Sequence, residues 1–179
     1  MSHGSHHREG SSVHAHRRDA EQALAAVVIT VSDTRTRETD TGGALAVELL
    51  ESAGHRVVER TLVRDEVDAI QKAVDAAVMR DDVHVVVLTG GTGIAARDVT
   101  PEALETLLDR TLPGFGELFR ALSYQEIGSA AMLSRAVAGI ARGRVVAALP
   151  GSRAAIRLAL ERLLLPELPH LAAEATKGA

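Results

Sequence analysis

The chain of 179 residues is long enough for one domain with its own core, and its 46% hydrophobic and 25% charged residues are usual for a globular protein. The net charge of -4 argues against a duplex-DNA-binding protein, because such proteins usually carry a basic surface. The absence of cysteine excludes disulfides, thiolate nucleophiles and cysteine-bound zinc.

Other function classes are disfavoured by what the sequence does not contain. No apolar run approaches the ~18 residues of a membrane span, and no secretory signal is visible, so we expect a cytoplasmic protein that does not bind membranes. The three aromatic residues lie in one short stretch, whereas a single-stranded nucleic-acid platform needs several in a basic groove. The spacing of Phe115 and Phe119 favours core packing over stacking on a ligand.

Residues 1–22 are polar and lack periodicity, which predicts a disordered tail. Five of the eight histidines lie there, at positions 3, 6, 7, 14 and 16. A metal site is one interpretation of this cluster, but the cluster lacks a fixed ligand geometry, so a solvated tail is the better one.

From residue 23 the hydrophobic pattern is regular. Short apolar runs rich in Val, Ile and Ala predict four buried strands, at 24–31, 55–63, 83–89 and 144–150. Helical spacing predicts helices at 44–54, 66–80, 101–109, 116–124, 129–140 and 152–168. We expect Thr100 to be the N-cap of the third helix and the last helix to break near Pro166.

The alternation of strands and helices predicts an α/β domain over residues 23–179, with a doubly wound, mostly parallel sheet covered on both faces. In such folds ligands bind beyond the carboxyl ends of the strands. The loops after Val31, Val63, Thr89 and Leu149 should therefore meet at one edge.

The segment "TGGTG" directly follows the third predicted strand. Glycine tolerates positive φ and lets the main chain approach a ligand, and successive N–H groups can then surround an anion. Gly90, Gly91, Thr92 and Gly93 are thus candidates for phosphate binding, although a tight turn is an equally good interpretation of these residues alone.

Two known phosphate-binding motifs do not explain this loop well. The Walker A motif requires a lysine after the glycines, and none is present. The dinucleotide motif G-x-G-x-x-G/A is matched by Gly91, Gly93 and Ala96, and keeps a nicotinamide-dependent oxidoreductase as an alternative. That alternative requires a helix that begins directly at the glycines, whereas the pattern predicts one that begins near Pro101.

Two carboxylates follow strands that end at the same edge, Asp65 after the second strand and Asp98 after the glycine loop. Carboxylates next to a phosphate site suit Mg²⁺, which proteins commonly hold with one or two carboxylates and substrate phosphates. Asp65 alone is better explained by a helix start, but the combination favours a magnesium site.

The segment "LTGGTGIAARDVTPEAL" resembles the signature of the molybdopterin adenylyltransferase family of molybdenum cofactor biosynthesis proteins, the MoaB/MogA type. The segments "ITVSDTRTRETDTGG", "LPGFGELFRALSYQEIGSAAMLSRAVAGI" and "ALPGS" extend the resemblance over about residues 24–170, and "EIG…LSRAVAG" is similar to the MoaB branch. The resemblance implies a three-layer α/β/α domain, a homo-oligomer (trimer or hexamer), and Mg²⁺-dependent adenylylation of molybdopterin by ATP. It also implies a molybdenum-insertion enzyme as a possible partner.

Roles of single residues follow from the resemblance. It implies Asp65 and Asp98 as catalytic, metal-binding residues; some MoaB-branch members lack the aspartate that Asp65 matches and are thought inactive. Nucleotide-binding candidates beside the glycine loop are Ser32, Asp33, Asp40 and Thr41, and molybdopterin-binding candidates are Ser134, Arg135, Pro150, Gly151 and Ser152. Each of these also has an ordinary interpretation as a turn, capping or exposed helix residue.

The sequence departs from the family pattern at two loops. Gly42 stands where the family usually has serine, so one hydroxyl contact is missing. "PGSRAA" replaces "PGSPKA", which removes a proline and a lysine and places Arg153 one position earlier than that lysine. The alternative function is a non-catalytic oligomeric protein of the same pathway that binds molybdopterin or nucleotide without turnover.

Overall fold

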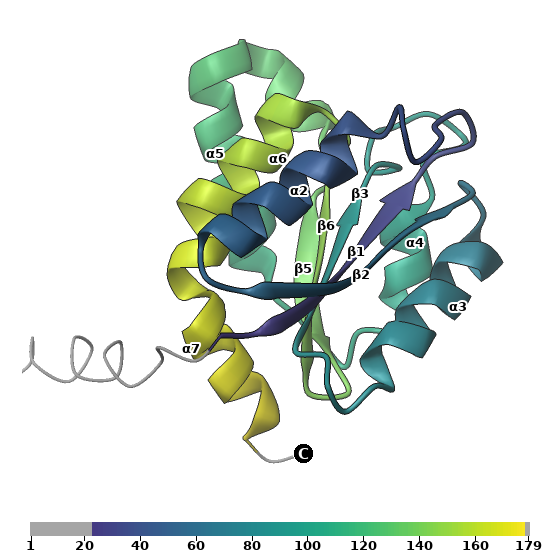
Figure 1. Ribbon diagram of the computed structural model, residues 1–179. Helices are drawn as coiled ribbons and strands as arrows, with labels where there is room; N and C mark the ends of the chain where they lie inside the picture. The colour runs from purple at the N-terminus through teal and green to yellow at the C-terminus, as the bar shows by residue number, and fades with distance from the viewer. Residues whose placement is uncertain (1–22, 178–179) are drawn as a thin grey trace, which may run out of the picture.

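The computed structural model describes residues 23–177, so the predicted N-terminal tail and its histidines lie outside the described residues. These residues form a single domain with helices on both faces of a six-stranded sheet (Figure 1). The strands are β1 (Ala25–Val31), β2 (Arg56–Val63), β3 (Val85–Thr89), β4 (Arg110–Thr111), β5 (Val137–Ala141) and β6 (Arg144–Leu149).

The sheet has the order β2-β1-β3-β6-β5-β4. Strands β1, β2, β3 and β6 are parallel, whereas β5 and β4 continue the sheet antiparallel to their neighbours. The predicted mostly parallel sheet is confirmed. The two antiparallel strands at one edge were not predicted, because β5 lies in a segment with a helical pattern.

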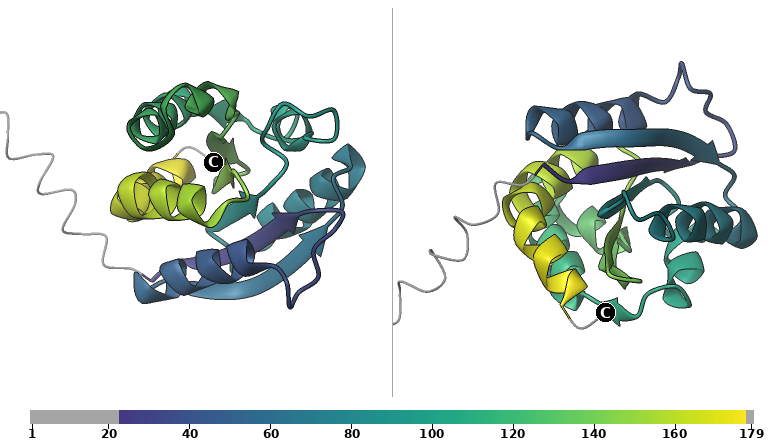
Figure 2. Two further views of the ribbon diagram at one scale, coloured as in Figure 1. Left: turned by 90° about the horizontal axis from the view of Figure 1, so that it is seen from above. Right: turned by 60° about the horizontal axis from the view of Figure 1, so that its bottom comes forward.

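One face of the sheet is covered by more helices than the other. The helices are α2 (Thr41–Ser52), α3 (Val67–Val78), α4 (Thr100–Glu105), α5 (Pro113–Ile127), η1 (Gly128–Leu133, 3₁₀), α6 (Arg153–Ala159), η2 (Leu160–Leu164, π) and α7 (Leu165–Thr176). Helices α2, α5, α6 and α7 share one core with the sheet, and α3 and α4 share the other (Figures 1 and 2). The predicted three-layer arrangement is therefore confirmed.

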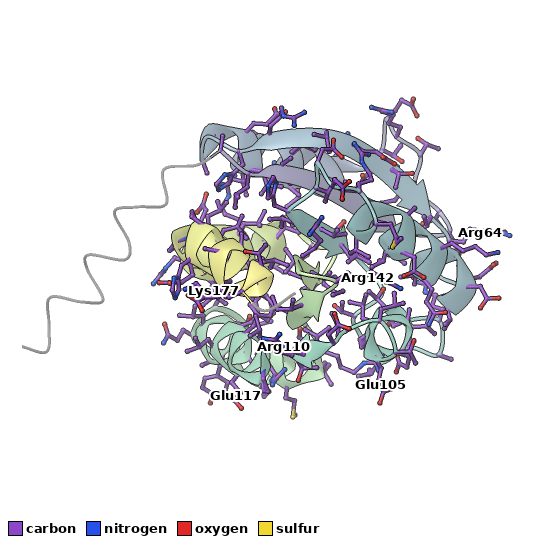
Figure 3. All side chains as sticks on the ribbon, turned by 90° about the horizontal axis from the view of Figure 1, so that it is seen from below. Arg64, Glu105, Arg110, Glu117, Arg142 and Lys177 are labelled. Carbon is purple, nitrogen blue, oxygen red and sulfur yellow. The ribbon has the colours of Figure 1, made fainter. Side chains whose placement is uncertain are left out.

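The strand sequences explain this two-sided burial. Successive strand residues face opposite sides of a sheet, so Val28 joins the core under α2 whereas its neighbour Ile29 joins the core under α3. Both are fully buried. Charged side chains such as Arg64, Glu105 and Glu117 point outward from the periphery (Figure 3).

The predicted helix at 129–140 is wrong. Gly128 ends α5 with φ 62°, a 3₁₀ segment follows, and the chain then forms β5. A Cβ on Gly139 would lie 2.4 Å from the carbonyl oxygen of Arg110, so glycine permits the close approach of β4. Pairing with β4 and β6 thus overrides the helix propensity of this alanine-rich segment.

Two local predictions concern proline residues. The last helix is interrupted just before Pro166, as expected, but by a π segment at Leu160–Leu164 after which α7 continues to Thr176. Thr100 is the first residue of α4 rather than its N-cap, which is Val99. The side chain of Thr100 instead donates a hydrogen bond to the glycine loop. Within residues 23–177, no helix is both long and apolar enough to cross a bilayer.

Candidate functional site

A cavity of about 230 Å³ lies beyond the carboxyl ends of β1, β3 and β6. These strand ends lie in the upper part of Figure 1. The glycine loop Gly90–Gly93 forms one wall. The loop after β6 and the end of β1 form others. The complete lining is Thr30, Val31, Arg35, Thr89, Gly90, Gly91, Thr92, Gly93, Asp98, Pro150 and Gly151. The expectation that these loops meet at one edge is confirmed for the loops that follow β1, β3 and β6.

The glycine loop requires glycine at two positions for steric reasons. Gly90 and Gly91 have φ of 101° and 65°, a region that side chains disfavour. A Cβ on Gly90 would lie 2.4 Å from the carbonyl oxygen of Val31, and one on Gly91 would lie 2.3 Å from Oγ1 of Thr100. Larger residues would therefore change the path of the main chain beside the cavity.

The first two carbonyl groups of the loop are held by Thr100. Its Oγ1 donates to the carbonyl oxygen of Gly90 at 2.9 Å. Its main-chain N–H donates to the carbonyl oxygen of Gly91 at 3.0 Å. The first residue of α4 thus fixes two carbonyl groups of the loop. Thr100 is itself buried, so its role in the site is to hold the loop.

The next two carbonyl groups are held by Arg135, which follows η1. Its main-chain N–H donates to the carbonyl oxygen of Thr92 at 2.9 Å, and its Nε donates to that of Gly93 at 2.8 Å. By contrast, the N–H groups of Gly91, Thr92 and Gly93 have no acceptor among residues 23–177. The loop therefore satisfies its acceptors internally and leaves three successive donors available to an anion.

Both predicted catalytic aspartates lie beside this loop. An Oδ1 atom of Asp65 lies 3.1 Å from the position of a Cβ on Gly91, and an Oδ2 atom of Asp98 lies 2.7 Å from that of a Cβ on Gly93. Asp98 lines the cavity, whereas Asp65 stands just outside its lining. Among residues 23–177, no group of three or more acidic, histidine or cysteine side chains is arranged to hold a metal, so a cation here would need ligand oxygens from a bound phosphate.

The electrostatics couple the two carboxylates. Burial, the nearby charge of Asp33 and, more weakly, the charge of Asp98 raise the pKa of Asp65 above its ordinary value. A cation placed between the carboxylates would oppose the repulsion and favour the ionised form. The donor set and its electrostatics therefore fit a hard divalent cation such as Mg²⁺.

The loop after β1 brings Arg35 to the cavity, a residue that was not among the predicted site residues. Ser32 accepts hydrogen bonds at its Oγ from the N–H groups of Thr34 and Arg35, which makes Ser32 a turn residue. This turn places Arg35 in the cavity lining. The position of Arg35 in a loop at the predicted ligand edge could have identified it from the sequence. The direction of its side chain could not be predicted, because it depends on the turn.

Two other predicted nucleotide-binding residues, Asp40 and Thr41, lie outside the cavity lining. Asp40 is buried and accepts hydrogen bonds from Thr30 at 2.7 Å, Gly43 at 2.9 Å and Arg60 at 2.8 Å. Burial alone would raise the pKa of Asp40, but these hydrogen bonds outweigh it and lower the pKa. Asp40 thus fixes the start of α2, and Thr41 begins that helix outside the cavity lining.

The predicted molybdopterin-binding residues divide into two groups. Pro150 and Gly151 line the main cavity. Pro150 also lines a neighbouring, mostly apolar cavity of about 150 Å³, together with Ser134 and Ser152. Ser152 additionally caps α6, since its Oγ accepts a hydrogen bond from the N–H of Ala155 at 3.2 Å. Arg135 lines neither cavity and contacts the glycine loop instead.

The two departures from the family pattern affect packing. A Cβ on Gly42 would lie 3.0 Å from Cδ1 of Ile156 and 3.2 Å from the carbonyl oxygen of Gly151, so α2 and α6 approach each other closely there. Arg153 donates to the carbonyl oxygen of Thr41 at 2.9 Å. Its guanidinium therefore joins these same two helices and does not line the main cavity.

The structure decides between the alternative interpretations of the glycine loop and of the two phenylalanines. The dinucleotide interpretation requires a helix that begins directly at the glycines, but α4 begins only at Thr100, so the geometry contradicts it. The expectation that Phe115 and Phe119 belong to the core is confirmed. Both are buried, and their ring centroids are 6.4 Å apart.

Known proteins resemble the chain over nearly all of the described domain. Residues 27–170 match the family described as probable molybdopterin binding domain. Molybdenum cofactor biosynthesis protein B of Bacillus subtilis is 50% identical over 167 residues, which cover 93% of this chain and 98% of that protein. The protein of the same name from Halalkalibacterium halodurans is 48% identical over 167 residues, with the same coverage of 93% and 98%.

Solved structures agree with this comparison. A crystal structure of a molybdenum cofactor biosynthesis protein B has a TM-score of 0.84 and 51% identity, covering 86% of this chain and 96% of its own. The tungsten cofactor synthesizing protein MoaB of Pyrococcus furiosus has a TM-score of 0.78 and 39% identity, covering 86% and 98%. From the shared fold, the matched residues 27–170 and about 50% identity, we conclude that the chain belongs to the molybdenum cofactor biosynthesis protein B (MoaB) family.

Proposed function

We propose that the protein catalyses the transfer of the adenylyl group of ATP to molybdopterin, with release of pyrophosphate. The observation that carries this proposal is the asymmetry of the glycine loop. Four successive carbonyl groups have internal donors, whereas the N–H groups of Gly91, Thr92 and Gly93 have no acceptor within residues 23–177. A row of unpaired main-chain donors suits the oxygens of a nucleotide phosphate.

The chemistry needs positioning more than a strong base. A phosphate oxygen of molybdopterin is already ionised, and it would form a bond to the α-phosphorus of ATP while the bond from that phosphorus to the bridging oxygen breaks. The electron pair leaves with pyrophosphate. The loop N–H groups would orient the nucleotide, and Arg35 in the cavity lining would offset the charge of its phosphates.

Asp65 and Asp98 are the residues that would hold Mg²⁺, together with phosphate oxygens. When bound, the ion would supply charge neutralisation for the leaving pyrophosphate. The neighbouring apolar cavity, which Ser134, Pro150 and Ser152 line, is the candidate site for the pterin because it adjoins the main cavity at Pro150.

The competing function is a non-catalytic protein that binds molybdopterin or nucleotide. The presence of both carboxylates beside the loop favours the enzyme, since a binding protein does not require a pair of metal-binding carboxylates. The deciding experiment incubates purified protein with ATP, Mg²⁺ and molybdopterin, and measures adenylyl-molybdopterin and pyrophosphate. Equal amounts of both products are expected. Binding of ATP and molybdopterin without product formation would refute the enzymatic function and leave the binding function.

We also propose that the protein assembles with copies of itself. Large apolar side chains are exposed along α5 and η1, with exposed fractions of 46–74% for Leu118, Tyr124, Ile127, Met132 and Leu133. Burial of these side chains against other copies would remove them from water. Light scattering coupled to size exclusion should give a trimer or hexamer mass, and a monomer mass at micromolar concentration would refute the proposal.

A further inference from the structure

Arg135 makes more contacts to the glycine-loop region than its predicted ligand role requires. Its main-chain N–H and Nε hold the carbonyl groups of Thr92 and Gly93. Its Nη2 donates to the main-chain carbonyl oxygen of Asp98 at 2.6 Å. Its Nη1 forms an ion pair with Glu102 on α4. One residue of the segment between η1 and β5 therefore contacts the loop, the segment of a proposed metal ligand and the following helix.

We propose that Arg135 is a positioning residue that holds the glycine loop and Asp98 in their binding geometry, rather than a ligand of molybdopterin. This inference rests on the proposed function, because nucleotide binding is what the loop geometry serves. The guanidinium attracts the carbonyl oxygens of Gly93 and Asp98 toward itself. The C=O of one residue shares a peptide plane with the N–H of the next. The guanidinium therefore fixes the peptide groups that follow Gly93 and Asp98, and the main-chain N–H of Arg135 fixes the peptide group that carries the N–H of Gly93.

The side chain of Arg135 is poorly placed to bind a ligand directly. Each of its three guanidinium nitrogens already has an acceptor in the protein. It lines neither of the two adjoining cavities. Three of the five guanidinium N–H groups are thus used to hold the side chain against the protein, outside both cavities, which argues for an indirect role.

Glu102 completes the arrangement. The hydrogen bond from Arg135 lowers the pKa of Glu102, which favours the ionised carboxylate. Because Glu102 belongs to α4, and Thr100 of the same helix holds the first half of the loop, the ion pair joins the two sets of loop contacts. A planar guanidinium with donors in fixed directions can serve three acceptors at once, which the single ammonium of lysine cannot do with the same geometry.

The test compares Arg135→Lys with the matched control Arg80→Lys. Arg80 has the same side-chain exposure of 35% and also pairs with acidic side chains, Asp82 and Glu59, but lines neither cavity. For Arg135→Lys we expect KM for ATP to rise by up to about 100-fold, since small misplacements of binding groups have effects of that order. We expect KM for molybdopterin to stay within about 3-fold, since the ion-pair charge is retained. Arg80→Lys should change neither.

A second readout does not depend on the reaction. Hydrogen exchange of the segment 90–98 should become faster in Arg135→Lys and stay unchanged in Arg80→Lys. Glu102→Gln should give a smaller effect, because the bonds from Arg135 to Gly93 and Asp98 remain. A rise in KM for molybdopterin alone would instead assign Arg135 to that substrate and overturn the proposal.

Unchanged ATP parameters together with unchanged exchange would also overturn the inference about Arg135. Failure of the proposed function is separately recognisable, because the wild-type protein would then form no product. In that case ATP binding measured by calorimetry replaces KM. Equal ATP affinity in wild type and Arg135→Lys, with equal exchange, would refute the positioning role.

Discussion

Asp33 and Asp65 hold each other through two reciprocal hydrogen bonds. The main-chain N–H of Asp33 donates to Oδ2 of Asp65 at 3.1 Å, and the main-chain N–H of Asp65 donates to Oδ1 of Asp33 at 3.2 Å. The contact joins the loops after β1 and β2 across the parallel pair of strands. Asp33 is thus placed to orient a proposed metal ligand, at the cost of like-charge repulsion that helps to raise the pKa of Asp65.

Removal of the Asp33 side chain should therefore impair adenylyl transfer by releasing Asp65. Asp33→Ala is expected to lower kcat about 10-fold, because Asp65 loses one of the bonds that orient it. Asp33→Asn keeps an oxygen acceptor for the N–H of Asp65 and should recover most of the rate. Steady-state kinetics at saturating ATP and Mg²⁺ measures both. If the asparagine variant is as slow as the alanine variant, the charge of Asp33 matters rather than its hydrogen bond.

Asp98→Asn separates the charge of this carboxylate from its structural bond. Oδ2 of Asp98 accepts from the N–H of Ala95 at 2.9 Å, and an asparagine amide oxygen can still do so. Loss of the charge should lower adenylyl transfer by about 100-fold or more, because a metal ligand is weakened. Affinity for ATP without Mg²⁺ should be unchanged. Full activity of this variant at limiting Mg²⁺ would contradict the metal-binding role.

Arg35→Ala should weaken ATP binding because it removes a cation from the cavity lining. We expect a loss of about 10-fold in affinity, the effect of one hydrogen bond to a charged group. The loss should shrink as ionic strength increases. Arg37→Ala is the control, since Arg37 lies two positions away and lines a different groove, between α2 and β2. Equal losses in both variants, measured by calorimetry, would indicate a general charge effect.

Gly91→Ala tests the steric requirement of the loop. Its Cβ would meet Thr100 Oγ1 at 2.3 Å, and φ is 65°, so the loop must shift. ATP affinity should fall at least about 10-fold, with a loss of stability of about 1–2 kcal/mol from the unfavourable φ. Gly114→Ala is the control, because no atom lies within 4 Å of its Cβ position and it is in helix α5. It should bind ATP normally and be unchanged or slightly more stable by thermal denaturation.

Asp40 predicts a specific pH dependence of stability. Its pKa is lowered below the ordinary 3.8 in the folded protein. Its contribution is therefore complete above about pH 3.8 and is lost as pH falls through the lower folded pKa. Asp40→Asn should lose about 3 kcal/mol at pH 7, because the partly buried Arg60 is left without its counter-ion.

Urea denaturation at several pH values measures this difference. The gap between wild type and Asp40→Asn should narrow at strongly acidic pH, where both side chains are uncharged. Glu48→Gln, an exposed change on the same helix α2, should follow the wild type at every pH. A gap that does not depend on pH would show that the geometry of Asp40, rather than its charge, stabilises the protein.

The parts of the fold that could be predicted are those whose environment is uniform. β1, β3 and β6 are buried on both faces, so each is a continuous apolar run. β5 could not be recognised, because "VAGIA" follows an alanine-rich segment and becomes a strand only by pairing with β6. The two-residue strand β4 likewise exists through its partner β5.

The same distinction applies to the site. Glycines and acidic residues at strand ends could be identified because their position in the topology already places them at the ligand edge. The direction of a long side chain could not. Arg135 lies near the site as expected, but its guanidinium donates a hydrogen bond to the carbonyl group of Gly93. Arg35 reaches the cavity through a turn that Ser32 holds.

The donors that hold the glycine loop are Thr100 and Arg135, and Arg135 follows the loop by more than forty positions in the sequence. The segment "TGGTG" alone therefore does not determine the conformation of the loop. Grafted into another protein, or present in a nascent chain that has not yet reached β5, it would have the freedom of any glycine-rich turn and no preferred shape. A ligand that meets the finished domain finds the loop already arranged, so association should proceed in a single kinetic step without a preceding closure of the loop.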